Sequence, residues 1–268
     1  MKTYVIIPQF LITDELVELA ENCIKTYREF SDCIIISVDD AGEYDKPKDA
    51  ERVLNLSDYV VRYDKNRGFG RACNAGFLKA FELAGEDDCY IICSNNDIEI
   101  NRKTVPALKE PFEIDMFWNP DNVAITGIIS STHKTWEMGS MENMDWRCYA
   151  SGGLLRDRMQ DGGLWMSKKS ILEKIGLFDE QFIRGGFEDI DLFLRARDTF
   201  GMLIIMSGRA VYWHKQGATR WSSMKVGAVN DFGVESKRIE DENHKKFFKK
   251  WGYSPYTKQV WTEKVYNC

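Results

Sequence analysis

Short β-branched runs alternate with helical segments through the first hundred residues, and this alternation restricts the fold more than any other feature of the sequence. The expected strands are residues 4–8, 33–38, 58–63 and 89–93, and the expected helices are residues 14–27 and 73–83. In both helical segments the apolar residues recur at a spacing of three or four. This order predicts an α/β fold, with a mostly parallel sheet between layers of helices.

The remaining residues show a weaker pattern. We expect strands at residues 123–129, 164–166, 203–206 and 210–213, and helices at residues 169–175, 188–199 and 234–251. Between them, residues 132–161 are polar and rich in Met, Trp and Gly, which favours long loops or a small antiparallel excursion. The chain therefore reads as a single α/β domain over residues 1–221 followed by a helical C-terminal extension over residues 222–268.

Composition restricts the class of protein. A chain of 268 residues with 44% hydrophobic residues can bury the core of a large α/β domain. The net charge of −6 disfavours nucleic acid as a partner, although a local basic groove stays compatible with it. No basic-then-apolar leader and no stretch of about 20 apolar residues is present, and the seven cysteines are scattered, so we expect a cytoplasmic protein with reduced thiols.

Polar residues follow two of the expected strands, where a core strand would be expected to end in a simple turn. Parallel sheets bind ligands at the carboxyl ends of their strands. After the second strand, Asp39 and Asp40 could accept the N–H of a uracil- or thymine-type base, or could simply form a turn. After the fourth strand, Asp97 beside Asn95 and Asn96 offers oxygen ligands for Mg²⁺ or Mn²⁺ holding a diphosphate, or closes the strand as an Asx turn.

A glycine-rich segment, NRGFGRACNAG over residues 66–76, leads into the second expected helix. Its glycines permit close backbone approach, and a helix N-terminus near Ala72 suits a phosphate that Arg71 could pair with. A loop–helix junction with a capping role is the alternative. The segment is neither a P-loop nor a Rossmann fingerprint, because no Gly-Lys-Ser/Thr follows and it comes after the third strand.

Three acids, Glu188, Asp189 and Asp191, begin the expected helix at residues 188–199. The helix dipole stabilises each by about 0.3–1 kcal/mol, which is a sufficient structural explanation, but it also favours the carboxylate that a general base needs. Asp189 and Asp191 lie two positions apart and point to different faces, so at most one of them reaches a substrate. His214 follows an apolar strand and is either a hydrogen-bonding residue or a metal ligand.

Taken in order, these segments resemble the family-2 inverting glycosyltransferases of the GT-A fold, including bacterial and phage rhamnosyltransferase-like members. The resemblance covers roughly residues 4–252 and is carried by VIIP, SVDDAG, NRGFGRACNAG, CSNNDIEI, DGGLWMSKK with GGFEDIDLF, YWHKQGATRW and NHKKFFKKWG. It implies a single Rossmann-like sheet flanked by helices. Residues 1–100 would be the nucleotide-binding half, and residues 101–221, with their small excursion, the acceptor-binding half.

The resemblance also implies a set of site residues. The donor nucleotide sugar would contact Pro8, Asp39, Asp40, Asn66, Arg71, Asn74, Asn95, Asn96 and Asp97. Asp97 and His214 would coordinate a divalent cation, Mn²⁺ or Mg²⁺, and Asn95 stands where the family often has an aspartate. The acceptor side would include Gly163, Trp165 and Glu188, with Trp165 either stacking beneath the sugar or belonging to the core.

The implied reaction is transfer of a hexosyl or deoxyhexosyl group from a UDP- or dTDP-sugar to a hydroxyl. Asp189 would be the base, with Glu188 and Asp191 in support, and a single in-line displacement through an oxocarbenium-like transition state would invert the anomeric carbon. The acceptor stays open among a glycan, a lipid-linked saccharide, a protein hydroxyl and, for a phage enzyme, a modified DNA base.

Two other classes compete with this interpretation. A nucleotidyltransferase would carry a Gly-rich stretch with Lys or Arg after the first strand, and the PQFLITDE found there lacks it. A non-catalytic sugar-nucleotide or glycan-binding module is disfavoured by the intact Glu188–Asp189 pair and His214. Residues 245–251 mix lysines with aromatic residues, which predicts either peripheral contact with an anionic membrane or a packed helix with solvated lysines.

Overall fold

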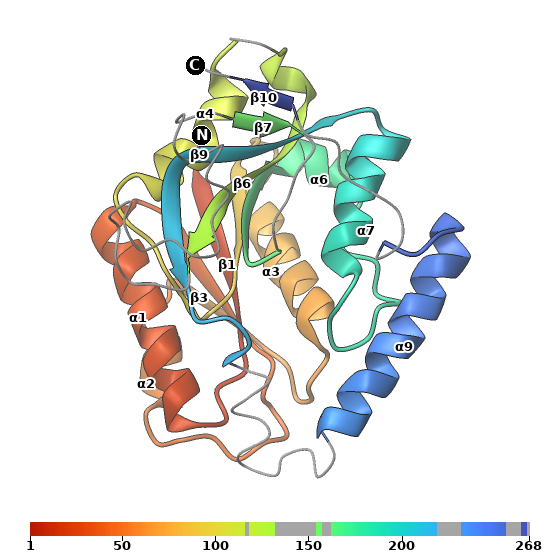
Figure 1. Ribbon diagram of the computed structural model, residues 1–268. Helices are drawn as coiled ribbons and strands as arrows, with labels where there is room; N and C mark the ends of the chain where they lie inside the picture. The colour runs from red at the N-terminus through yellow and green to blue at the C-terminus, as the bar shows by residue number, and fades with distance from the viewer. Residues whose placement is uncertain (116–117, 132–153, 157–161, 219–231, 256–263, 267–268) are drawn as a thin grey trace.

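A twisted mixed sheet with helices on both faces forms the centre of the molecule (Figure 1). The computed structural model describes residues 1–115, 118–131, 154–156, 162–218, 232–255 and 264–266. Within these ranges the strand order is β10-β7-β9-β6-β8-β4-β1-β2-β3, and β5 pairs with β9 outside this path.

The strands are β1 Thr3–Gln9, β2 Ile34–Asp39, β3 Tyr59–Arg62, β4 Tyr90–Ser94, β5 Ile98–Glu99, β6 Val123–Ser131, β7 Leu154–Arg156, β8 Leu164–Lys168, β9 Leu203–His214 and β10 Lys264–Tyr266. The α-helices are α1 Asp14–Phe30, α2 Ala50–Leu54, α3 Phe69–Ala84, α4 Thr104–Glu113, α6 Lys169–Ile175, α7 Glu188–Leu194 and α9 Phe232–Trp251. A 3₁₀ turn, Pro120–Asn122, precedes β6, and a π-helical stretch, Arg195–Thr199, continues α7.

The first half of the sheet is parallel, as predicted. β1 lies between β2 and β4, with Gln9 opposite Asp39 and Ile6 opposite Cys93. This register brings the carboxyl ends of the three strands to one edge of the sheet. The second half is mixed, because β8 runs antiparallel to both β4 and β6, while β6 and β9 are parallel to each other.

Two hydrophobic layers cover the faces of the sheet. On one face, α1 contributes a stripe that includes Leu16, Ala20 and Ile24, and α2 and α4 complete the layer. The opposite layer is formed by α3, α6 and α7. Thr13 caps α1 by accepting a hydrogen bond from the backbone N–H of Leu16 at 3.2 Å, in agreement with the expected helix start.

Several elements differ from the prediction. α3 begins at Phe69, four residues early, because Gly68 at a φ of 86° turns the chain directly into the helix. Residues 203–214 form one continuous strand where two were expected. A register shift against β6, in which Ile128 faces Ser207 and Ile129 faces Val211, accommodates the polar residues in its middle. The short elements α2 and β5 and the helix α4 were not predicted.

The C-terminal helix α9 packs on the segment that precedes and includes α7 (Figure 1). Phe247 of α9 is fully buried in a cluster with Phe182, Phe187 and Leu194. The predicted domain boundary near residue 221 falls outside the described residues, as does the predicted excursion at 132–161 except for β7, so both stay predictions.

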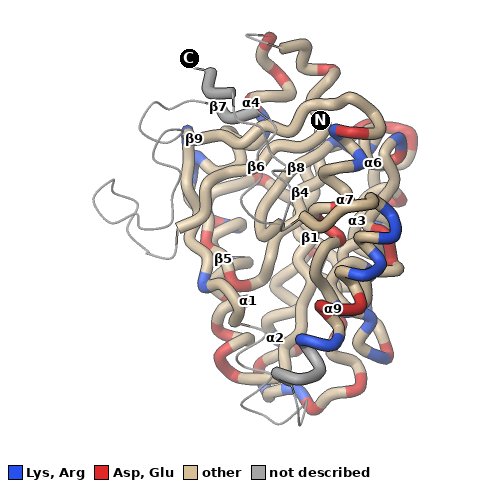
Figure 2. The backbone as a smooth tube through the Cα atoms, turned by 45° about the vertical axis from the view of Figure 1, so that its right-hand side comes forward, with Lys and Arg blue, Asp and Glu red and all other residues tan. Residues whose placement is uncertain are grey.

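Some side chains of the basic and aromatic run on α9 pack against the domain, and others are exposed to solvent. Lys246 donates a hydrogen bond to the backbone oxygen of Gln181, and Lys250 forms an ion pair with Asp179, whereas Phe248 is 53% exposed. Figure 2 shows basic and acidic positions interspersed along this helix. In the described part of the chain, no helix is long and apolar enough to span a bilayer.

The close contact of α3 with β1 predicts that Gly76→Val is strongly destabilising. A Cβ atom at Gly76 would lie 2.1 Å from Cγ2 of Ile6, inside a core with no room to shift. We expect the free energy of unfolding to fall by about 2–3 kcal/mol, measured by urea denaturation. Leu78→Val, on the exposed side of the same helix, is the control and should change it by less than about 0.5 kcal/mol.

Candidate active site

The end of β4 lies against the end of β9. After β4, the chain passes through residues 95–97 into β5, which pairs antiparallel with β9 so that Ile98 faces His214. This register places Nε2 of His214 3.2 Å from Oδ1 of Asp97, and both side chains are buried. The backbone N–H of Lys215 donates to the backbone oxygen of Asp97 at 3.0 Å and holds the junction in place. The two predicted metal ligands therefore come together.

Asn95 joins this pair. Its Nδ2 lies 3.3 Å from Nε2 of His214, and its backbone N–H donates to the carbonyl oxygen of Gly163 at 2.8 Å. The oxygen and nitrogen of an amide are distinguished only by their bonding, so a half-turn of the side chain would present Oδ1 at the same position. A carboxylate, an imidazole and an amide thus converge on one point at the edge of the sheet.

This donor set fits a divalent cation that is shared with a phosphate-bearing ligand. Mg²⁺ and Mn²⁺ accept carboxylate and amide oxygens, and Mg²⁺ sites commonly combine one or two carboxylates with water and substrate phosphates. Among the described residues, no group of three or more His, Cys, Asp or Glu side chains forms a complete cage. The arrangement therefore suits an open site, in which the ligand supplies the remaining oxygens.

Gln9 is a further buried polar residue at this edge, and none of the sequence motifs contains it. Its Oε1 accepts a hydrogen bond from Asn96 at 3.1 Å, and its Nε2 donates to Ser37 at 3.3 Å. These two hydrogen bonds connect the ends of β4, β1 and β2. They fix the side chain of Asn96, the residue that precedes Asp97. The available signal was a glutamine directly after Pro8 at the end of an apolar strand, where a fully buried amide requires polar partners.

Asp39 and Asp40 are both buried, and the two carboxylates have different partners. Asp39 forms ion pairs with Lys46 and, at 3.3 Å, with Arg62. Asp40 accepts backbone hydrogen bonds from Arg67 at 2.6 Å and from Gly68 at 2.9 Å. Burial raises the pKa of Asp40 to about 6, against the opposing effect of these two donors. Asp40 therefore anchors the loop before α3, and Asp39 is the carboxylate with side-chain cations around it.

The other donor residues predicted from this loop lie around Asp40 and the segment 178–180. Asn66 donates to the backbone oxygen of Asp40 at 3.1 Å, and Arg71 contacts Glu180. Asn74 is buried and bonds Phe178 through both ends of its amide, at 2.9 and 3.0 Å. In contrast to the prediction, Asn74 thus fastens α3 to the chain before α7, because its amide is already engaged inside the protein.

Asp189 lies on the first turn of α7, against the glycine pair that precedes β8. A Cβ atom at Gly162 would be 2.5 Å from Oδ2 of Asp189, so only glycine lets the chain pass this close to the carboxylate. The next residue, Gly163, accepts the hydrogen bond from Asn95 described above. Residues 162–163 therefore connect the predicted base with the strand end that holds Asp97.

Glu188 is also buried, next to the start of α3. Its Oε2 has no hydrogen-bond partner among the residues that the structure describes, and the side chain packs against Gly70. Burial, followed by repulsion from Asp189, raises the pKa of Glu188 to about 8. At neutral pH the pair therefore consists of a protonated acid beside Asp189.

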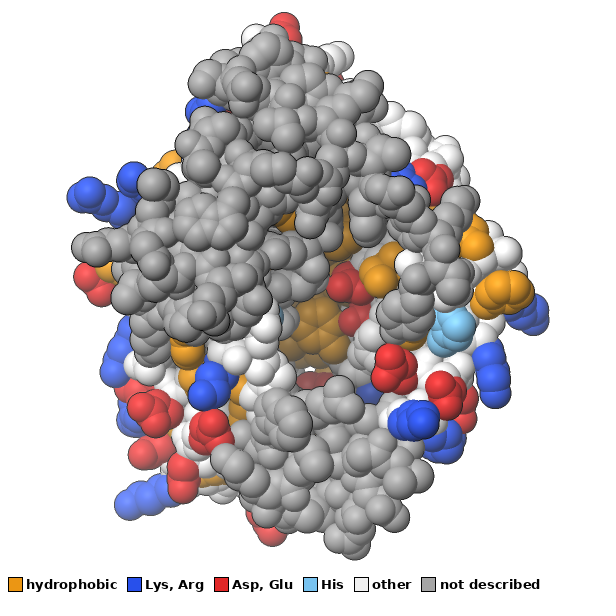
Figure 3. Space-filling model, in the orientation of Figure 1, with side chains coloured by type: hydrophobic (Ala, Val, Ile, Leu, Met, Phe, Trp, Pro, Cys, Tyr) orange, Lys and Arg blue, Asp and Glu red, His pale blue; other side chains and the backbone are white. Residues whose placement is uncertain are grey.

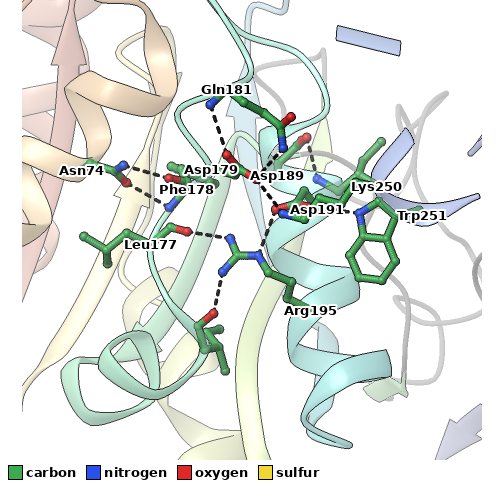
Figure 4. Close-up of polar contacts among 12 residues, drawn as sticks. Asn74, Leu177, Phe178, Asp179, Gln181, Asp189, Asp191, Arg195, Lys250 and Trp251 are labelled. Atoms are coloured by element: carbon green, nitrogen blue, oxygen red, sulfur yellow. Dashed lines mark hydrogen bonds and ion pairs between the residues drawn. The ribbon is translucent and has the colours of Figure 1, made fainter. Parts of the chain in front are cut away.

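Asp191 points away from this group, toward α9 (Figure 4). It is fully buried and accepts hydrogen bonds from Arg195 at 2.9 Å and Trp251 at 2.9 Å, with Lys250 at 2.7 Å. The supporting catalytic role predicted for Asp191 is corrected accordingly, because three donors engage its carboxylate between α7 and α9. The expectation that Asp189 and Asp191 face different sides is confirmed.

Trp165 is likewise a core residue. It is fully buried and lies within 6.0 Å, between ring centroids, of Phe77, Phe178 and Phe193. A ring that is enclosed by other rings has no free face, so the predicted stacking beneath a sugar is corrected. Gly163 and Pro8, in contrast, lie at the edge of the sheet where the candidate site is found.

In the orientation of Figure 1, Figure 3 shows acidic and hydrophobic side chains together near the middle of this face of the molecule.

No protein-family model and no curated protein matches the sequence. Solved structures do resemble the fold. GalNAc-T7 with UDP, GalNAc and Mn²⁺ has 14% identity and a TM-score of 0.59, over 80% of this chain and 44% of that protein. The mannosyltransferase PcManGT from Pyrobaculum calidifontis, in complex with GDP-Man and Mn²⁺, has 15% identity and a TM-score of 0.57, over 92% and 69% of the two chains. S. aureus TarS 1–349 has 13% identity and a TM-score of 0.53, over 97% and 75%.

These similarities establish that the chain has the GT-A fold, as the sequence predicted. All three neighbours are glycosyltransferases. The chain spans 44% of the length of GalNAc-T7, 69% of PcManGT and 75% of the TarS 1–349 fragment, but only 44% of a longer TarS chain.

The raised pKa of Glu188 predicts a pH-dependent stability that Glu188→Gln removes. The folded protein keeps the proton up to a pH of about 8, whereas the unfolded chain loses it near 4.5. Because the folded state binds more protons between these values, the free energy of unfolding falls as the pH rises, by up to about 1.4 kcal/mol per pH unit.

Urea unfolding of wild type and Glu188→Gln between pH 6.5 and 8 measures this effect above the pKa of Asp40, which is about 6. The wild type should lose stability more steeply than the variant. Equal slopes would mean that Glu188 is ionised in the folded protein.

Proposed function

We propose that this protein is a metal-dependent glycosyltransferase that moves a sugar from a nucleoside-diphosphate sugar to a hydroxyl acceptor, with inversion at the anomeric carbon. The observation that carries the proposal is the joining of two groups at the carboxyl edge of a GT-A sheet. Asp97, His214 and Asn95 form one group. Asp189 packs against Gly162, and the next residue, Gly163, accepts a hydrogen bond from the backbone of Asn95.

Asp97 and His214, with Asn95 beside them, would hold the divalent cation. When bound, Mn²⁺ or Mg²⁺ supplies the positive charge that stabilises a departing nucleoside diphosphate. Two of the structural neighbours contain Mn²⁺ together with UDP or GDP-Man, which supports a nucleotide sugar and a metal of this kind. Gln9 would hold the loop of residues 95–97 in place through its hydrogen bond with Asn96.

Asp189 would accept the proton of the acceptor hydroxyl. Its carboxyl group lies on the first turn of α7, and a helix N-terminus favours negative charge. The oxygen of the acceptor would then attack the anomeric carbon as the bond to the diphosphate breaks, in one displacement without a covalent enzyme intermediate. Glu188, held neutral, adds no second negative charge against the approaching donor.

The nucleotide would lie along the ends of β1 and β2. Asp39, with Lys46 and Arg62 around it, offers both an acceptor for a base N–H and cations for the ribose-phosphate edge. We propose a UDP- or dTDP-sugar as donor, since a carboxylate accepts the single ring N–H of uracil and thymine. A panel that contains UDP-, dTDP- and GDP-sugars with Mn²⁺ tests the proposal by the release of UDP, dTDP or GDP, and no binding or hydrolysis of any donor would refute it.

Asp97→Asn should weaken nucleotide binding only when the metal is present. Removing the charge from the cation site is expected to raise the Kd for UDP with Mn²⁺ at least about tenfold, or about 1.4 kcal/mol, in calorimetric titrations. Asp87→Asn, which changes an exposed carboxylate before the opposite end of β4, is the matched control. Unchanged affinity in Asp97→Asn would remove Asp97 from the metal site.

Asp189→Asn should abolish transfer and spare donor binding. Loss of a general base costs about 10²–10⁴-fold in kcat, while the residues that hold the donor are untouched. The measurement is kcat with the best donor of the panel, alongside the Kd for the same nucleotide. Asp198→Asn, at an exposed position beyond α7, should keep wild-type turnover. Near-normal kcat in Asp189→Asn would place the base elsewhere.

A further inference from the structure

The loop before α7, residues 183–187, is held in a conformation that its own residues disfavour. Arg184 has a φ of 59° and Phe187 a φ of 76°, both in the left-handed region that residues with a side chain avoid. Residues that carry a Cβ atom adopt this region only at a cost in free energy. Since Phe187 is the residue directly before Glu188 and Asp189, the shape of this loop sets where α7 begins.

One side of the loop rests on the start of α3. The backbone N–H of Phe69 donates to the carbonyl oxygen of Arg184 at 3.2 Å. A Cβ atom at Gly68 would lie 2.6 Å from Cα of Arg184, so the two backbones are in direct contact. This contact limits how far the loop can move toward α3. It does not involve the carbonyl groups of Ile183, Gly185 and Gly186, which are bonded from another side.

Asn243 of α9 supplies those partners. Its Nδ2 lies 3.0 Å from the carbonyl oxygen of Ile183, 3.2 Å from that of Gly185 and 3.3 Å from that of Gly186. Its Oδ1 accepts the backbone N–H of Ile183 at 3.1 Å. The side chain is fully buried, so water cannot replace it. A single amide therefore bonds three of the five residues in the loop.

The aromatic contacts of α9 act at the same point. The ring of Phe187 packs against His244 and Phe247, with centroid distances of 5.8 and 5.6 Å. Phe187 makes these two ring contacts while its backbone is in the left-handed conformation. In the ribbon view, α9 lies beside α7 along this contact (Figure 1).

We propose that Asn243 is a positioning residue, which holds the loop 183–187 in its strained shape and so places Asp189 against Gly162 at the candidate active site. The inference rests on the proposed function, in which Asp189 is the base. Without the amide, the carbonyl oxygens of Gly185 and Gly186 lose the side-chain donor that holds them, while that of Ile183 keeps the backbone N–H of Gly185 at 2.7 Å. The loop then gains by relaxing toward ordinary backbone conformations. A shift of about 1 Å at Asp189 is enough to lower turnover by about 100-fold.

A purely architectural role for α9 predicts something different. Lys250 also fastens α9, through Asp179 at 2.6 Å and Asp191 at 2.7 Å, and both of these carboxylates belong to residues outside the loop 183–187. Lys250→Met therefore loosens the docking of α9 and leaves the loop bonded to Asn243. If α9 only adds stability, variants at Asn243 and Lys250 with the same loss of stability should have the same turnover.

The test compares Asn243→Asp with Lys250→Met. Asn243→Asp keeps the size and the acceptor of the side chain but replaces its donor with a second oxygen facing the three carbonyls. We expect kcat to fall about 10–100-fold with the donor Kd unchanged within about twofold, whereas Lys250→Met keeps kcat within about twofold. Asn55→Asp, the same change at an exposed position, controls for the added charge.

Hydrogen exchange supplies a readout that does not depend on turnover. Backbone amides of residues 184–189 should exchange faster in Asn243→Asp than in wild type, while those of β1 and β4 stay protected. If Asn243→Asp does not fold, Asn243→Ser, which retains one small donor, replaces it in this comparison. Its amides at residues 184–189 should exchange faster than in wild type but more slowly than is expected for Asn243→Asp.

Wild-type kcat in a folded Asn243 variant, or an equal loss of kcat in Lys250→Met, would overturn the positioning role. If wild-type protein transfers no sugar, the proposed function fails and the exchange comparison still decides: unchanged protection of residues 184–189 refutes the positioning role, and faster exchange supports it.

Discussion

The parallel alignment of β2, β1 and β4 is the constraint on which the candidate site depends. Because Gln9 faces Asp39 and the three strands point the same way, their polar ends share one edge of the sheet. The antiparallel pairing of β5 with β9 then brings His214 to the same edge, although 117 positions separate it from Asp97. Changing any of these registers by one residue would turn the polar side chains to the opposite face.

Buried amides and carboxylates connect the segments that surround this edge. Gln9 joins three strand ends, Asp40 holds the loop before α3, and Asn74 ties α3 to the segment before α7. Asp191 and Asn243 do the same between α7 and α9. Each is buried and each bonds a segment distant in sequence, so the loss of one partner leaves an unsatisfied polar group in the interior. Such bonds give the site a defined geometry at a cost in tolerance to substitution.

Electrostatics divide the three acids of α7 between different tasks. Asp191 is bonded to Lys250 and Trp251 of α9, and burial keeps Glu188 protonated, which leaves Asp189 as the acid beside Gly162. The helix dipole acts on all three, so it cannot distinguish them. The distinction comes from what each side chain contacts, and it would be lost if α7 rotated on its axis.

The sequence by itself determined the fold class and the parallel first half of the sheet, because strand runs and polar strand ends are local patterns that parallel topology brings together. The pairing of Asp97 with His214 was implied only by the family resemblance, and the antiparallel contact of β5 with β9 decided it. The sequence also determined that Asp189 and Asp191 face different sides, since helical spacing is local. Only the tertiary structure decided that Trp165 belongs to the core, that Asn74 and Asp191 are engaged inside the protein, and that Asn243 holds the loop before α7. Burial and hydrogen-bond partners depend on segments distant in the chain, and no local pattern encodes which segments will meet.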